Sequence, residues 1–356
     1  MAYTNQMSEE FGGEYMGPHQ GMIMKLAAGL YEDIYIGGSL NSKEGAMVLE
    51  TDYFFNEQME TLMESGSNIK SNKKYARYIP QEDLLGYYSF SYDLETIGEG
   101  IEEMTMPLVR EVPMFGEMAA EAIEVLDIII DEDAIYELIQ GDMILAFTGL
   151  KQFERTQVEY DEEFNAQEYT VEETLPLFNL MLTTGDPEEM AHLFKLGEAA
   201  SVLLPGQNSS FKLSIPGEDL PMDIFLAMKE DIVFITNDQE LVETRLVTEL
   251  EKENRMAKQH RKMLKKNSQV FYVDLPMTME TVSGLLPPDA QGPQVQSMIE
   301  NFRSVFRDVT ITTDRKVKNQ MLRSEMRMNF IDQDRNGLEQ ILYFANELVF
   351  AAMSGS

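Results

Sequence analysis

One short run of oxygen-bearing side chains has the spacing of a metal site. Asp332, Asp334 and Asn336 alternate along the chain and are followed by glycine, as in the first half of a calcium-binding loop. Such a loop ends on a bidentate Glu, but this chain has Tyr343 at that position. The preceding residues, 326–330, have the alternation of a strand, whereas a calcium loop follows a helix. We therefore expect a polar turn that caps the next helix, with calcium as the alternative.

No residues in the chain form a recognisable catalytic set. The three histidines, His19, His192 and His260, are far apart in the sequence, and there is no cysteine. Phosphate-loop, nucleophile-elbow, zinc-helix and dinucleotide-turn motifs are all missing from the sequence. With 62 acidic residues, the chain has enough carboxylates for a pair of the kind that glycosidases use. The sequence singles out no two of them. The sequence therefore predicts no catalytic residue.

Basic side chains are concentrated in one segment. We interpret residues 252–266 as a surface that docks an acidic partner or the acidic part of the chain itself. The alternative is a solvated helix face or a linker between domains. The seven residues are Lys252, Arg255, Lys258, Arg261, Lys262, Lys265 and Lys266.

Outside that segment the chain is strongly acidic. Its net charge is −34, and residues 1–250 have 13 basic side chains against 49 acidic ones. Such a surface repels nucleic acid and anionic membranes. We therefore expect a protein partner and no nucleic acid.

The length and composition predict a folded protein with more than one core. A chain of 356 residues with 44% hydrophobic content exceeds the size at which a single core usually stops growing. No apolar run approaches the length of a membrane span, so no transmembrane segment is expected. The predicted organisation is a flexible tail at 1–22, a first domain at 23–165, a second at 166–350 and a tail at 351–356.

A strand that leads directly into a helix recurs along the chain. Residues 87–97 align without a gap on residues 272–282, with aromatic, Leu, Met, Glu and Thr positions in correspondence. A third strand at 177–184 precedes Asp186, a good helix N-cap, and Pro187, a good first helical residue. A further strand–helix pair is predicted at 321–330 and 337–352, and a helical segment at 104–140.

Hairpins are expected to follow these units, one joining 143–147 to 158–160 and one joining 224–228 to 232–236. The chain should open with strands at 34–36 and 46–54 around a turn at 37–42. A helix is predicted from 237 to 251, continuing into the basic run. The recurring order, strand–helix–hairpin–helix, predicts α+β domains, each an antiparallel sheet covered by helices on one face.

Four phrases carry a family resemblance that covers most of residues 24–350: residues 85–92, 138–143, 229–238 and 336–342. Together they resemble a family of uncharacterised Bacteroidetes envelope lipoproteins. The resemblance implies a location in the periplasm or on the outer-membrane surface. It also implies a lipid anchor in an N-terminal region outside this sequence, because members begin with a lipidated cysteine. The family has no assigned catalytic residues, so none are implied here.

These observations favour a non-enzymatic envelope protein that binds a partner protein or assists envelope assembly. One alternative is a carboxylate-dependent hydrolase acting on a glycan-type polymer. Another is an acidic structural protein of a cytoplasmic or viral assembly.

Overall fold

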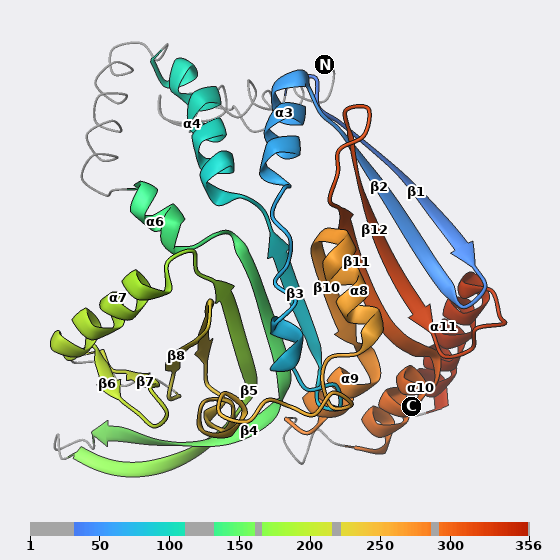
Figure 1. Ribbon diagram of the computed structural model, residues 1–356. Coiled ribbons are helices and arrows are strands. Elements are labelled where there is room, and N and C mark those ends of the chain that lie inside the picture. Colours follow the sequence, from blue (N-terminus) through green and yellow to red (C-terminus); the bar gives the residue numbers. More distant parts are fainter. Residues whose placement is uncertain (1–31, 111–131, 161–165, 216–221, 286–291, 355–356) are drawn as a thin grey trace, which may run out of the picture.

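A single antiparallel sheet organises the chain. The computed structural model describes residues 32–110, 132–160, 166–215, 222–285 and 292–354 (Figure 1). The twelve strands found there all belong to this sheet, and every neighbouring pair is antiparallel. In spatial order they are β1 (Tyr35–Lys43), β2 (Ala46–Phe54), β12 (Met321–Phe330), β11 (Phe306–Asp314), β10 (Asn267–Asp274), β3 (Gly86–Ser91), β4 (Asp142–Tyr160), β5 (Ala166–Thr183), β9 (Ile232–Thr236), β8 (Phe225–Lys229), β7 (Phe211–Leu213) and β6 (Leu203–Pro205).

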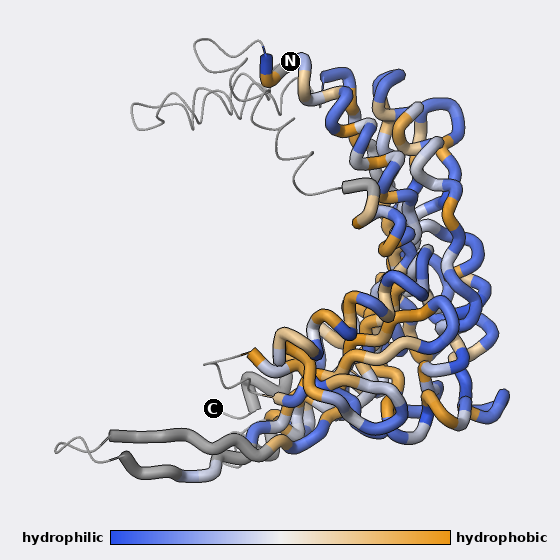
Figure 2. Tube along the Cα trace, turned by 60° about the vertical axis from the view of Figure 1, so that its left-hand side comes forward, coloured by the Kyte–Doolittle hydropathy of each residue, from blue (hydrophilic) through white to orange (hydrophobic). Residues whose placement is uncertain are grey.

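Helices connect these strands, so the predicted mixed α+β class is confirmed. The N-terminal hairpin meets the last described strand, because β2 pairs with β12, and the trace bends into an open arc (Figure 2). The described helices are α3 (Glu57–Gly66), the 3-10 helix η1 (Tyr75–Arg77), α4 (Leu94–Arg110), α6 (Glu132–Leu138), α7 (Pro187–Ala199), the π-helix η2 (Leu241–Arg245), α8 (Lys258–Lys266), α9 (Leu275–Ser283), α10 (Pro293–Val305) and α11 (Gly337–Ser354).

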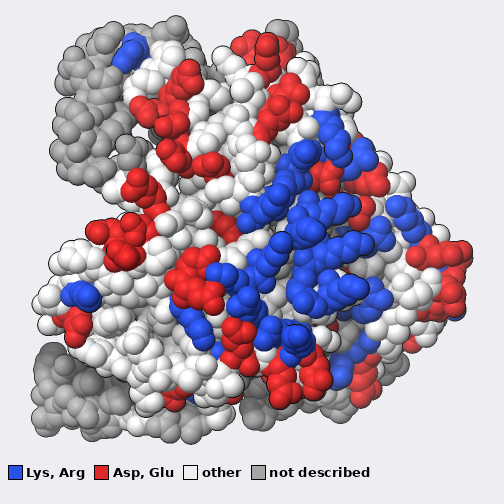
Figure 3. Space-filling model, viewed as in Figure 1, with Lys and Arg blue, Asp and Glu red and all other residues white. Residues whose placement is uncertain are grey.

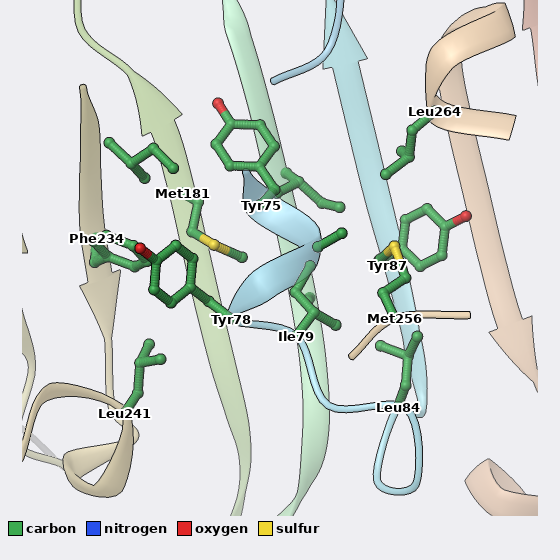
Figure 4. Close-up of a cluster of buried hydrophobic side chains, with 14 of the residues drawn as sticks. Tyr75, Tyr78, Ile79, Leu84, Tyr87, Met181, Phe234, Leu241, Met256 and Leu264 are labelled. Atoms are coloured by element: carbon green, nitrogen blue, oxygen red, sulfur yellow. The ribbon is translucent and has the colours of Figure 1, made fainter. Parts of the chain in front are cut away.

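The largest core lies on the face of the sheet that carries α8, called here the α8 face. Directly paired residues share a face, and the register aligns Ile144, Met181 and Phe234 on β4, β5 and β9. Tyr87 of β3 lies opposite Ala146, which is two residues from Ile144 and therefore on the same face. All five side chains are buried. They are covered by η1, η2 and the segments beside them, which supply Tyr75, Tyr78, Ile79, Leu241 and Met256 (Figure 4).

Two smaller cores lie on the opposite face. At one end Phe194 of α7 packs against β9 through Val233. At the other, Phe302 and Phe344 of α10 and α11 pack against Phe306. The helices α7, α10 and α11 therefore share one face, while α8 lies on the other, so the described helices cover both faces of the sheet.

β4 and β5 form a hairpin much longer than their neighbours. Their pairing runs out to Tyr160 and Ala166, but β3 and β9 accompany them only near the other end, at 142–147 and 179–183. The register shifts near Gly149, whose φ of 90° belongs to a bulge. The predicted domain boundary at 165/166 separates β4 from β5, two strands that pair with each other in the same sheet.

Two predicted hairpin details are wrong. Residues 37–42, predicted as a turn because of their Gly, Ser and Asn content, lie within β1, and the turn is at Glu44 and Gly45. An edge strand tolerates such residues because it has a neighbour on one side only. The ranges 143–147 and 158–160, predicted to pair with each other, both belong to β4 and pair with β5.

The helix predicted at 237–251 is also wrong. Only the single π-helical turn η2 forms, and the chain is irregular until α8 begins at Lys258. The intervening residues bind another segment: Met256 N–H donates to the Ile79 carbonyl (2.9 Å), and Gln81 N–H donates to the Asn254 carbonyl (3.0 Å). Because these contacts bury Met256 completely, tertiary packing outweighs the local helix preference.

Of the two predicted tails, only the C-terminal one includes described residues. The tail at 1–22 lies outside the described residues, as does the part of the predicted helical segment at 111–131. At the other end α11 continues to Ser354, so a helix occupies most of the predicted tail at 351–356.

Candidate functional site

A basic groove runs between α8 and the strands beside it. Its volume is about 540 Å³, and its walls come from α8, β10, β11 and β12. In the space-filling view Lys and Arg side chains gather on this part of the surface, whereas acidic side chains dominate around α3 and α4 (Figure 3). The cations that line the groove are Lys262, Lys266, Arg307, Arg323 and Arg327.

Strand alternation aims the β12 arginines into the groove. Arg327 lies opposite Thr310 of β11, and Thr310 lies opposite Tyr272 of β10, so all three side chains are on the α8 face. Arg323 shares that face because it lies four residues earlier in the same strand. The sheet thus holds two arginines at fixed positions across from the lysines of α8.

Helix α8 is held against this face by its apolar side. Leu264 is buried in the main core, and His260 packs on Tyr272 and Tyr87 with ring centroids 4.2 Å and 5.6 Å apart. Burial lowers the pKa of His260 to about 4, so this imidazole is neutral at pH 7. The positive charge of the groove therefore comes from Lys and Arg alone.

The arginines of the groove are already paired with carboxylates. Arg323 makes a bidentate contact with Asp52 at 2.7 Å and 3.0 Å, and this hydrogen bonding lowers the pKa of Asp52. Arg327 binds Glu325 at 3.0 Å. Arg307 binds the adjacent Asp308 (2.8 Å), whose other oxygen accepts from Asn329 at 2.6 Å.

The α8 cations, in contrast, face solvent without an ion-pair partner among the described residues. All five are exposed, and α8 has a basic last turn with no acidic residue in its first. Cations at a helix C-terminus are favourable because they oppose the negative end of the helix dipole. The five are Lys258, Arg261, Lys262, Lys265 and Lys266.

The other two residues of the predicted basic segment lie outside the groove. Lys252 is exposed in a turn. Arg255 is half-buried, binds Glu249 at 3.0 Å and donates to the Leu250 carbonyl. Sequence reasoning missed the arginines on β11 and β12, because they are separated in the chain and converge only through strand pairing. The alternation of Arg323, Glu325 and Arg327 was the one readable signal.

The predicted calcium residues form a polar turn. Asp332 accepts hydrogen bonds from the backbone N–H groups of Asp334 and Arg335 at 3.0 Å and 3.2 Å. Asn336 accepts from the backbone N–H of Leu338 (3.0 Å) at the start of α11. Strand β12, rather than a helix, precedes the turn, and nowhere in the described ranges do three or more acidic or histidine side chains gather as a metal site would require.

One buried carboxylate has a structural role. Asp142 accepts from the backbone N–H of Asn72 (2.6 Å) and from the hydroxyls of Ser91 and Thr183. Burial raises the pKa of Asp142 in spite of these donors. The hydroxyl of Tyr75 closes the network on the Asp142 carbonyl. Asp142 is 2% exposed, and its hydrogen bonds tie the segment at Asn72 to β3 and β5.

Comparisons with known proteins give no relative: no protein family, no curated protein and no solved structure matches the chain. Within the described part, no helix combines the length and the apolar character needed to cross a bilayer.

Proposed function

We propose that this protein is a non-enzymatic docking protein, whose basic groove binds an acidic segment of a partner protein. The single observation that supports this best is the row of five exposed cations on α8, none of them ion-paired within the described ranges, in a chain of net charge −34. An acidic segment would lie between these cations and the arginines of β11 and β12. Charge complementarity of this kind speeds encounter and selects partners.

The ion pairs of the carboxylates in the groove support a binding protein over a hydrolase. A glycoside hydrolase needs one acid kept protonated and a second carboxylate free to act. The acids that line the groove, Asp308, Asp314 and Glu325, each have a cationic partner within 3.7 Å. These ion pairs engage the carboxylates of the groove with its own cations, so no two of them are left as the free pair that such an enzyme needs.

The mixed charge of the groove supports a protein partner over a uniform polyanion. Nucleic acids and anionic membranes present negative charge over long distances and would meet the acidic remainder of the molecule. A short acidic segment fits within the groove and avoids that repulsion. The envelope location stays a prediction, supported by the family resemblance alone.

The proposed internal repeat is supported by the centre of the sheet. Tyr87 and Tyr272, which correspond in the aligned segments, are directly paired between β3 and β10. Strand–helix–hairpin–helix then leads outward on both sides, ending in α7 and in α11. Hairpin β8–β9 extends one half beyond β5, and hairpin β1–β2 extends the other beyond β12, so the N-terminal hairpin would complete the C-terminal repeat.

The test measures binding of a labelled polyglutamate peptide by fluorescence anisotropy. Reversing both groove lysines, with Lys262→Glu and Lys266→Glu, should weaken binding at least about tenfold, equivalent to about 1.4 kcal/mol. The matched control reverses Lys151 and Lys195, which are exposed on β4 and α7, and should bind as the unaltered chain does.

Equal losses in the two variants would show that net charge alone governs binding, and would overturn the proposed site. A duplex oligonucleotide and vesicles of anionic lipid provide the other two probes. If either bound more tightly than polyglutamate at physiological salt, the protein-docking function would be wrong.

A further inference from the structure

The two edges of the sheet are protected very differently. β6, at one edge, has three residues and includes Pro205, a short form that resists pairing with another chain. β1, at the other, has nine residues, no proline and a charged side chain only at its last position, Lys43. Among the described residues, β1 pairs with β2 alone, so its outer backbone groups have no strand partner.

Apolar side chains are exposed along this free edge. Tyr35, Ile36 and Leu40 are 65%, 69% and 67% exposed, more than any other large apolar side chain described. A long, apolar, unpaired edge strand is a template for strand addition. Soluble proteins normally place charges there, so the pattern on β1 indicates that the edge is covered by another strand.

Two adjacent glycines in β1 are not required by any contact within the described residues. Neither Gly37 nor Gly38 has a left-handed backbone, and a Cβ at Gly38 would meet only the Glu50 carbonyl, at an ordinary 3.4 Å. Glycine weakens a strand interior and often marks the close approach of another backbone. The second backbone is not supplied by the described part of this chain.

We propose that β1 is a self-association edge, on which the β1 strand of a second copy pairs antiparallel about a two-fold axis through Gly38. In this register Ile36 of each copy lies opposite Leu40 of the other, giving two apolar cross-strand pairs. Asp33 lies in the turn just before β1, with φ of 59°, so at each end of the paired strands Lys43 of one copy would come near the turn that holds the acidic side chain of the other. At the axis, glycine faces glycine and leaves no side chains to collide.

The occupant is a second copy because the strand is complementary to itself. The same register satisfies the backbone edge, pairs the two exposed aliphatic side chains and brings the opposite terminal charges near each other. Lys43 has no ion-pair partner in the described ranges, and the Asp33 carboxylate accepts only from the Tyr35 hydroxyl, at 3.4 Å. This inference does not rest on the proposed function of the groove.

Cysteine cross-linking tests the register, because the native chain contains no cysteine. In the full-length Gly38→Cys variant, the two introduced thiols would lie on directly opposed residues with Cα atoms about 4.5–5.5 Å apart, which suits a disulfide. Mild oxidation should therefore give a covalent dimer. In Leu40→Cys the thiols would be offset by four residues, roughly 13 Å at about 3.3 Å per residue, and should not cross-link.

A mixture of Ile36→Cys and Leu40→Cys chains should form the mixed covalent dimer, which checks the register without altering Gly38. Circular dichroism confirms that each variant is folded. Equal cross-linking of Gly38→Cys and Leu40→Cys would indicate random collision and overturn the proposal. So would failure of both the Gly38→Cys chain and the mixture to cross-link.

Sedimentation equilibrium supplies an independent measurement. The native chain should be dimeric, and Leu40→Lys should be monomeric because lysine replaces the apolar pair. Leu204→Lys places the same change on β6 at the opposite edge and should remain dimeric. A native chain that is monomeric at millimolar concentration, or a Leu204→Lys variant that dissociates equally, contradicts the inference.

Discussion

His260 lies in the wall of the basic groove but is held neutral by its burial. Its ring packs between Tyr87 and Tyr272, and the nearby Asp308 opposes the effect of burial only weakly. The folded-state pKa of about 4 compares with about 6.5 in an unfolded chain. The unfolded state therefore binds more protons between these values, and stability must fall as the pH is lowered through this window.

We expect His260 to remove about 3 kcal/mol of stability between pH 6.5 and pH 4, at about 1.4 kcal/mol per pH unit. Urea unfolding of the native chain and of His260→Phe between pH 6.5 and pH 4 measures this loss of stability, because phenylalanine keeps an aromatic ring but cannot be protonated. His192→Phe, at an exposed position on α7, is the control. Parallel pH profiles for the native chain and His260→Phe would contradict the assignment.

At the scale of elements, the start of α7 is built from its local sequence. The Asp186 carboxylate accepts from the backbone N–H groups of Glu188 and Glu189, both at 2.9 Å, and Pro187 fills the first turn. Asp186→Ala should lower the free energy of unfolding by about 1 kcal/mol. Asp186→Asn keeps a capping oxygen and should cost less. Chemical denaturation measures the free energy of unfolding of the two variants. Equal losses of stability would mean that the capping hydrogen bonds do not account for the effect.

Elements with such local signals were predicted well from the sequence. Asp186 caps α7 as expected, and the predicted passage from strand directly into helix at 272–282 is seen where Asp274 ends β10 and caps α9. Strands β8, β9 and β12 also lie where alternation placed them. Their boundaries follow from capping and periodicity, which depend on neighbouring residues only.

Long-range pairing decided the rest of the fold. The segment after η2 does not form the predicted helix, because its backbone is hydrogen-bonded to residues 79–81. β4 was predicted as two separate strands because nothing local reveals that both parts pair with one partner, β5. Only one wall of the groove was predicted. The cations of α8 form one continuous run in the sequence, whereas Arg307, Arg323 and Arg327 come together only through sheet register.

At the scale of the whole molecule, the proposed dimer would arrange its grooves in a defined way. Pairing of antiparallel strands about a two-fold axis keeps each face of the sheet continuous, so both α8 faces would lie on the same side. An acidic partner long enough to reach both grooves would gain from effective concentration without any new contact. The binding of short and long polyglutamate should then differ more for the dimer than for Leu40→Lys.

The pairing of β2 with β12 also has a consequence for the time course of folding. Ala46 lies beside Asn329, so the β1–β2 hairpin has to wait for a strand that is synthesised much later before it can join the sheet. Contacts this distant in sequence form slowly. In pulsed hydrogen exchange during refolding, the amides of β2 should gain protection late, together with those of β12. Early protection of β2 alone would show that the hairpin folds independently. Late protection would mean that the free edge of β2 stays open to wrong partners until β12 has been synthesised.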